Sequence, residues 1–90
     1  LYGAEAKYLV ALQLYKAHEY AAAEKEILNF IEQSTPHAYW LARSFILLSD
    51  VYVAMDKKLD ARQYLLSLQQ NYHADDDIEQ MINERLEKLK

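Results

Sequence analysis

The chain contains no cysteine, only one glycine, Gly3, and only one proline, Pro36. Without cysteine there can be no disulfide and no thiolate metal site. Glycine and proline are the commonest turn-forming residues, so their scarcity argues against a turn-rich β fold and favours helices. A single glycine also excludes a glycine-rich phosphate-binding loop, and no G-x-S-x-G sequence is present to hold a nucleophilic serine.

Clustered positive charge and long apolar runs are missing as well. The formal net charge is −4, acidic and basic residues are mixed along the chain, and Lys57-Lys58 is the only basic doublet. Proteins that bind nucleic acids need clustered lysine and arginine to neutralise phosphates, so we expect no nucleic-acid partner. No apolar run approaches the ~20 residues of a membrane-spanning helix, so we expect no membrane insertion. There is no signal-peptide pattern, and the start at Leu1 leads us to expect a fragment of a longer chain.

Hydrophobic residues make up 52% of the sequence, and the frequent residue types are good helix formers. Ninety residues are enough for one domain at most, so residues 1–90 are expected to form a single all-α domain. Apolar residues recur at helical spacing, with Thr35 and Pro36 suited to the start of the third helix. The predicted helices are, approximately, 4–17, 20–33, 36–55, 59–71 and 77–90.

An internal repeat relates the first and second pairs of helices. A shift of 37 residues places Tyr15 on Tyr52, and a shift of 38 places Ala23 on Ala61, as if the turn had gained one residue. The predicted unit is therefore helix–turn–helix. Repeat one covers about 4–34, repeat two about 36–71, and a capping helix about 77–90. Ala23 and Ala61 are small enough to let paired helices cross closely.

These residues resemble the tetratricopeptide-repeat (TPR) family, and specifically the C-terminal repeats of bacterial TPR scaffold proteins. The resemblance is carried by Ala11, Leu14-Tyr15, His18-Glu19-Tyr20 and Ala23, and by Val51-Tyr52, Ala54, Asp56 and Ala61. The small position of the second unit is Leu48 or Ser49, depending on where the extra residue lies. The resemblance implies a short right-handed solenoid with a C-terminal cap, a non-catalytic protein-binding role, and a location in the bacterial cytoplasm or cell envelope.

In that family the first helix of each unit lines a concave groove. The resemblance therefore implies that six residues lie on or beside a groove for a protein or peptide partner: Tyr8, Leu12, Tyr15, Phe45, Ser49 and Tyr52. Aromatic side chains there would offer broad apolar contact together with a phenol for hydrogen bonding. The alternative is that these side chains pack between successive units.

Three acidic or histidine-containing features are candidate chemical sites. Asp50 lies in the most apolar helix and needs a partner, for which Arg43 and Arg62 are the candidates; catalysis would need a second titratable group, and none is visible. The consecutive acids of 75–77 lack the glycine and spacing of a calcium loop and are better suited to capping the last helix. His18, His37 and His73 are too far apart for paired zinc ligands. We therefore expect no cofactor, no metal and no enzymatic activity.

The last predicted helix is amphipathic, with an apolar stripe of Ile78, Met81, Ile82, Leu86 and Leu89. It would cover the end of the repeat array, or else dock onto another chain. The alternative function is thus a structural terminal repeat that self-associates as a homodimer or packs on the rest of a longer scaffold. Its interface would be the last helix or the surface around Tyr39 and Trp40.

Overall fold

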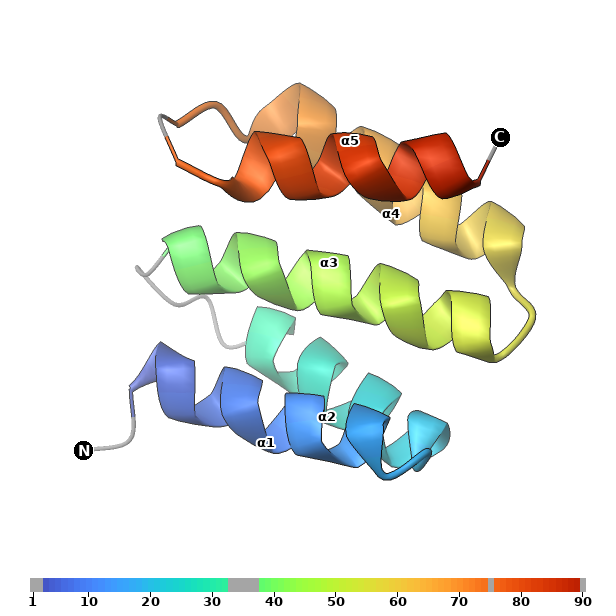
Figure 1. The fold of residues 1–90 in the computed structure, drawn as a ribbon. Coiled ribbons are helices and arrows are strands. Elements are labelled where there is room, and N and C mark those ends of the chain that lie inside the picture. The colour runs from blue at the N-terminus through green and yellow to red at the C-terminus, as the bar shows by residue number, and fades with distance from the viewer. Residues whose placement is uncertain (1–2, 33–37, 75, 90) are drawn as a thin grey trace.

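The computed structural model describes residues 3–32, 38–74 and 76–89, which form helices and contain no strand (Figure 1). The predicted all-α class is confirmed. The proposed start of the third helix at Thr35 and Pro36 lies outside the described residues. The helices are α1 Ala4–Lys16, α2 Tyr20–Glu32, α3 Ala38–Ala54, α4 Lys58–Asn71 and α5 Ile78–Lys88.

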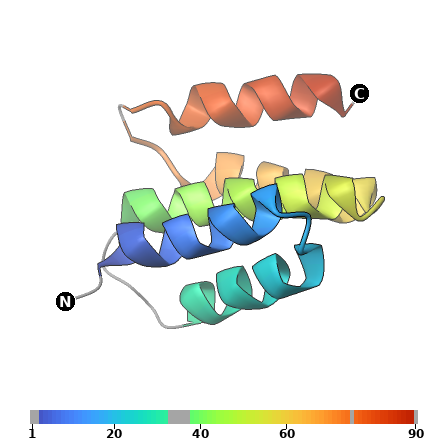
Figure 2. The same cartoon turned by 60° about the horizontal axis from the view of Figure 1, so that its bottom comes forward.

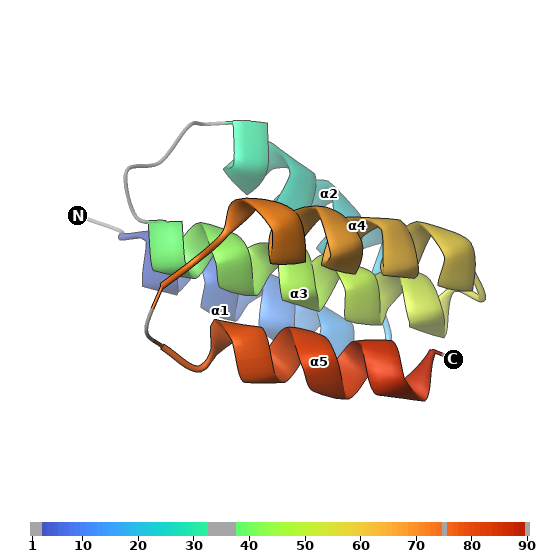
Figure 3. The same ribbon diagram turned by 90° about the horizontal axis from the view of Figure 1, so that it is seen from above.

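The helices form two hairpins, α1–α2 and α3–α4, followed by α5. The central helix α3 contacts all four other helices, as expected for a helix that is apolar nearly all round. Seen from above, α2 and α4 lie on one side of α3 and α5 on the other (Figure 3). In the view of Figure 2, α2 and α5 are at opposite ends of the molecule, separated by the α3–α4 hairpin.

Two hydrophobic clusters hold these helices together. The first joins the hairpins and includes Leu47 and Leu48 of α3 against Ala23 and Ile27 of α2. The second joins α3 and α4 to α5, through the buried side chains Ala42, Ile46, Leu65, Leu68, Ile78 and Ile82. Ala23 and Ala61 are both 0% exposed, which agrees with small residues at close helix crossings.

The turns of the two hairpins have the same backbone structure. His18 and Asp56 adopt the left-handed conformation, with φ of 64° and 63°. The residue after each donates a backbone hydrogen bond across the helix end: Glu19 N to Leu14 O at 2.9 Å, and Lys57 N to Tyr52 O at 2.7 Å. This is the Schellman pattern of helix termination. His18 therefore corresponds to Asp56, a shift of 38 residues, and the predicted insertion in the turn is wrong.

Because the two turns are equivalent, the same shift of 38 residues relates the helices that precede them, α1 and α3. Ala11 then corresponds to Ser49, and these side chains are 2% and 1% exposed. Ser49, rather than Leu48, is therefore the small position of the second unit. Tyr15 corresponds to Val53, so Tyr15 and Tyr52, which the 37-residue shift matches, do not occupy equivalent places.

Candidate functional site

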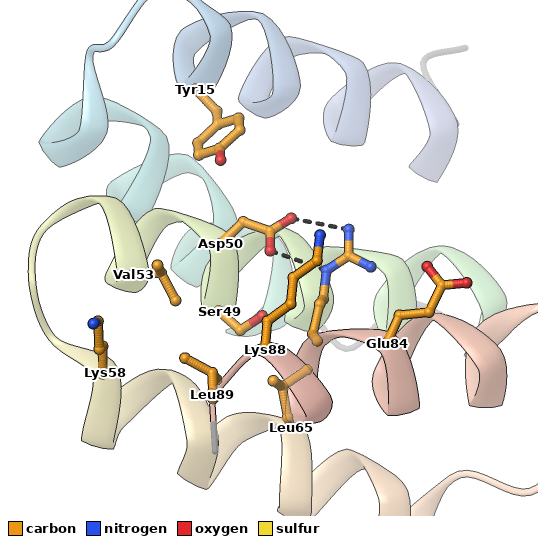
Figure 4. A pocket seen from close by; sticks show the side chains of 10 residues that line it. Tyr15, Ser49, Asp50, Val53, Lys58, Leu65, Glu84, Lys88 and Leu89 are labelled. Atoms are coloured by element: carbon orange, nitrogen blue, oxygen red, sulfur yellow. Dashed lines mark hydrogen bonds and ion pairs between the residues drawn. The ribbon is translucent and has the colours of Figure 1, made fainter.

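An open groove of about 480 Å³ lies among α1, α3, α4 and α5 (Figure 4). Its lining combines apolar side chains with three cations, two carboxylates and one phenol. The lining residues are Tyr15, Ser49, Asp50, Val53, Lys58, Leu65, Glu84, Arg85, Lys88 and Leu89. The groove thus contains side chains from both hairpins and from the last helix.

An ion pair between Asp50 of α3 and Arg85 of α5 lies at the centre of the groove. Arg85 Nε donates to Asp50 Oδ1 at 2.9 Å and Arg85 Nη2 donates to Oδ2 at 3.1 Å, which makes the pair bidentate. Nη1 donates to the Met81 carbonyl at 3.2 Å and so fixes the guanidinium on its own helix. Both side chains are about one quarter exposed, 27% for Arg85 and 25% for Asp50.

The expected partners of Asp50, Arg43 and Arg62, are therefore wrong. Arg43 lies instead over three aromatic rings, at 5.0 to 5.9 Å from the ring centroids of Tyr8, Tyr39 and Trp40. Cation–π contacts of this kind hold a guanidinium against an apolar surface. Arg85 is separated from Asp50 by 35 residues, so only the docking of α5 reveals the pair.

Tyr15 of α1 projects toward Asp50 from the opposite wall of the groove (Figure 4). Burial and, secondarily, the negative charge of Asp50 raise the pKa of the Tyr15 phenol. The phenol therefore remains protonated at neutral pH and presents an O–H donor to the groove.

The groove lining contains more positive than negative side chains. Because Arg85 neutralises Asp50, the remaining charged groups of the lining are Lys58, Lys88 and Glu84. They leave the groove with a surplus of one positive charge. Val53, which is 38% exposed, adds an accessible aliphatic surface. The groove thus combines an accessible aliphatic surface with a surplus of positive charge.

Of the six predicted groove residues, the structure brings Tyr15 and Ser49 to the groove. The Ser49 hydroxyl already donates to the Ile46 carbonyl at 2.6 Å. Leu12 is partly buried against the cluster that joins the two hairpins. The predicted set is therefore not gathered on one surface.

The three other aromatic residues of the set pack within the protein. Tyr8 and Tyr52 are each 7% exposed. The Tyr8 ring lies 5.6 Å from Trp40, and the Tyr64 ring lies 5.6 Å from Tyr52 and 6.0 Å from Phe45. Burial and a hydrogen bond with Glu24 raise the pKa of Tyr52. The Tyr8–Trp40 and Tyr52–Glu24 contacts join the two units, as in the alternative interpretation, whereas the contacts with Tyr64 lie within the second unit.

Most residues of the groove lining could not be predicted from the sequence. Val53 could have been predicted, because it lies one helical turn beyond Ser49 and Asp50. The residues from α4 and α5 gave no comparable signal, since their position depends on how these helices dock. They are Lys58, Leu65, Glu84, Arg85, Lys88 and Leu89.

The acids before α5 cap and anchor that helix. Asp76 Oδ1 accepts from the Ile78 backbone N–H at 3.0 Å, which satisfies a free N–H at the start of α5 as predicted, whereas Asp77, the N-cap residue itself, makes no side-chain capping hydrogen bond. The Tyr72 hydroxyl donates to Asp76 at 2.5 Å, and the Tyr39 hydroxyl donates to Asp77 at 2.9 Å. Within the part of the chain that the structure describes, no three histidine or acidic side chains are close enough together to hold a metal ion.

The Asp50–Arg85 pair is expected to contribute to stability. In a double-mutant cycle of Asp50→Ala and Arg85→Ala, we expect a coupling free energy of about 1 kcal/mol, because the pair is bidentate but still partly solvated. The measurement is urea unfolding of the four proteins. High salt should reduce the coupling, since the pair is partly exposed. A coupling of zero at low salt would contradict a structural role for the pair.

No family model, curated protein or solved structure matches the chain.

None of the helices in residues 3–32, 38–74 and 76–89 combines the length and the apolar character that crossing a membrane requires.

Proposed function

We propose that this chain is a non-catalytic, TPR-like interaction module that binds a peptide or partner segment in the groove among α1, α3, α4 and α5. The observation that carries the proposal is the open groove itself, which exposes aliphatic, phenolic and charged groups on one surface. Its volume of about 480 Å³ lies within the range of roughly 300–1,000 Å³ that is typical of ligand-binding clefts. A short segment of a partner protein would fill it.

The lining indicates the chemistry of that segment. Val53 and Leu89 offer aliphatic contact, and the Tyr15 phenol offers a hydrogen-bond donor. Lys58 and Lys88 line the same groove as the Asp50–Arg85 pair and can receive carboxylates. The partner that fits best is therefore a segment with aliphatic and acidic side chains, and positive charge would be repelled.

Two labelled peptides that share the same leucines test this function. One carries glutamates and the other carries lysines at the same positions. We expect the acidic peptide to bind more tightly in fluorescence anisotropy, and added salt to weaken its binding. The double variant Lys58→Glu, Lys88→Glu should lose at least about tenfold in affinity, equivalent to roughly 1.4 kcal/mol.

The matched control is Lys25→Glu, which reverses an exposed charge on α2 outside the groove. This variant should bind the acidic peptide as the unmodified chain does. Equal affinity for the two peptides, or equal losses in the control and the double variant, would contradict the proposed groove.

A second function is favoured by a different surface. Leu9 and Val10 of α1 are 45% and 52% exposed, as expected if this end of the chain packs against another helical element. This observation supports the alternative role, a structural repeat that self-associates or packs within a longer scaffold. The surface concerned is on α1, rather than on the last helix or around Tyr39 and Trp40.

A further inference from the structure

The outward side of α1 carries an apolar stripe. Leu9 and Val10 are the large exposed residues on it, 45% and 52% accessible. Helical spacing places Ala6, Gln13 and Ala17 on the same side, one turn or two turns away. We call these five residues, of which Ala17 directly follows the helix, the outer stripe of α1. Its small alanines on either side of larger aliphatic groups are typical of a helix face that packs closely on another helix.

The internal repeat shows what covers the equivalent face elsewhere in the molecule. In the 38-residue register set by the turns, Leu9 corresponds to Leu47 and Val10 to Leu48. Leu47 and Leu48 are only 3% and 0% exposed. The α1–α2 hairpin covers them, and its contribution to the shared cluster is Tyr8, Ala11, Ala23 and Ile27. In α3 these two positions are thus covered by the preceding hairpin, whereas in α1 the equivalent positions are exposed.

The opposite end of the molecule has a different character. In the described part of α5, every exposed residue is polar or charged: Glu79, Gln80, Asn83, Glu84, Glu87 and Lys88. A polar outer face is what a terminal element of a helical repeat array requires for solubility. The stack of helices therefore has a polar surface at the α5 end and an apolar stripe at the α1 end.

We propose that the outer stripe of α1 is the docking site for a further helix–turn–helix unit, stacked on α1 as α1–α2 stacks on α3. The docking unit would present a face of small and aliphatic side chains, since such a face covers Leu47 and Leu48. The proposal concerns a surface separate from the groove and does not depend on groove binding.

A second copy of this chain fits the stripe less well. The hairpin face that could cover it, on α1–α2, is already occupied by α3 of the same copy. The α5 end is polar. Direct pairing of two α1 helices would join only Leu9 and Val10 of each copy as large apolar side chains, far short of the roughly 800 Å² per partner of a stable interface.

A chain in which residues 3–40 are duplicated ahead of Gly3, so that the two copies are 38 residues apart as in the internal repeat, tests the proposal. It supplies a hairpin of the required kind and keeps the natural connection between units. The added hairpin is the outer copy, and the original hairpin, which packs on α3, is the inner copy. We expect Leu9→Lys and Val10→Lys in the inner copy to expose the outer hairpin, so that its amides exchange with solvent about tenfold faster or more than in the unsubstituted duplicated chain. The control places the same two substitutions in the outer copy, where they face solvent and should leave protection unchanged.

Two results would overturn the proposal. One is an added hairpin that is unprotected, or whose protection is insensitive to the inner substitutions. The other is a mass for the 10.6 kDa chain that doubles with concentration in light scattering and returns to the monomer value with Leu9→Lys and Val10→Lys. That result would assign the stripe to a second copy. A constant monomer mass, together with a protected added hairpin, supports the proposal.

Discussion

Replacement of Leu48 by alanine is expected to lower the free energy of unfolding by about 2–5 kcal/mol. The Leu48 side chain is 0% exposed and lies in the cluster that joins the two hairpins. Its truncation removes apolar contacts and leaves a cavity that the surrounding helices fill only in part. Because small domains have a total stability of roughly 5–15 kcal/mol, a loss of this size is a large fraction of the whole.

Val10→Ala is the matched control, because Val10 occupies the equivalent position in the first hairpin and is 52% exposed. Its effect should stay within about 0.5 kcal/mol. Urea unfolding of both variants, followed by the fluorescence of Trp40, the only tryptophan, measures the difference. Similar losses in the two variants would contradict the 38-residue register and the different burial of the two helices.

Truncation of Ile82 to alanine is expected to have an effect of similar size, about 2–5 kcal/mol, confined mainly to one end of the molecule. Ile82 is 1% exposed and joins α5 to Ile46 and Leu65. Among the helices of the described residues, α5 contacts α3 and α4, so weaker packing of this helix lets it open while the first hairpin stays folded. Arg85 and Lys88 would then leave the groove.

Hydrogen exchange and peptide binding together test this prediction. In Ile82→Ala, the amides of α5 should lose protection more than those of α1 and α2, and affinity for the acidic peptide should fall. Glu79→Gln, an exposed substitution on the same helix, should change neither. If protection fell evenly along the chain, α5 would be an integral part of one cooperative unit, contrary to this expectation.

Helix positions could be predicted from the sequence because apolar spacing reports them directly. The expected segments 4–17 and 59–71 differ by one residue at an end from α1 and α4, and the segment 20–33 agrees with α2 as far as the structure describes it, to Glu32. The capping role of Asp76 was also predictable, because a cap acts on the backbone two residues away. These features depend on residues that are close in sequence.

The groove was harder to predict because it depends on register and docking. Two tyrosines 37 residues apart, Tyr15 and Tyr52, suggested the wrong alignment, whereas the left-handed turn residues His18 and Asp56 define the correct one. Neither turn residue is glycine, so composition gave no sign of the conformation. The partner of Asp50 lies 35 residues away on α5, and no periodic pattern relates two helices at that distance.

The central place of α3 also affects how the chain acquires its structure. This helix contacts all four others, so neither hydrophobic cluster can be completed before it forms. Helices that are neighbours in the sequence also pack on each other. The chain loops that must be closed during folding are therefore short, which favours fast folding. During synthesis, α3 emerges after the α1–α2 hairpin, which can cover Leu47 and Leu48 immediately. The order of the helices thus shortens the time for which the most apolar segment is exposed to other nascent chains.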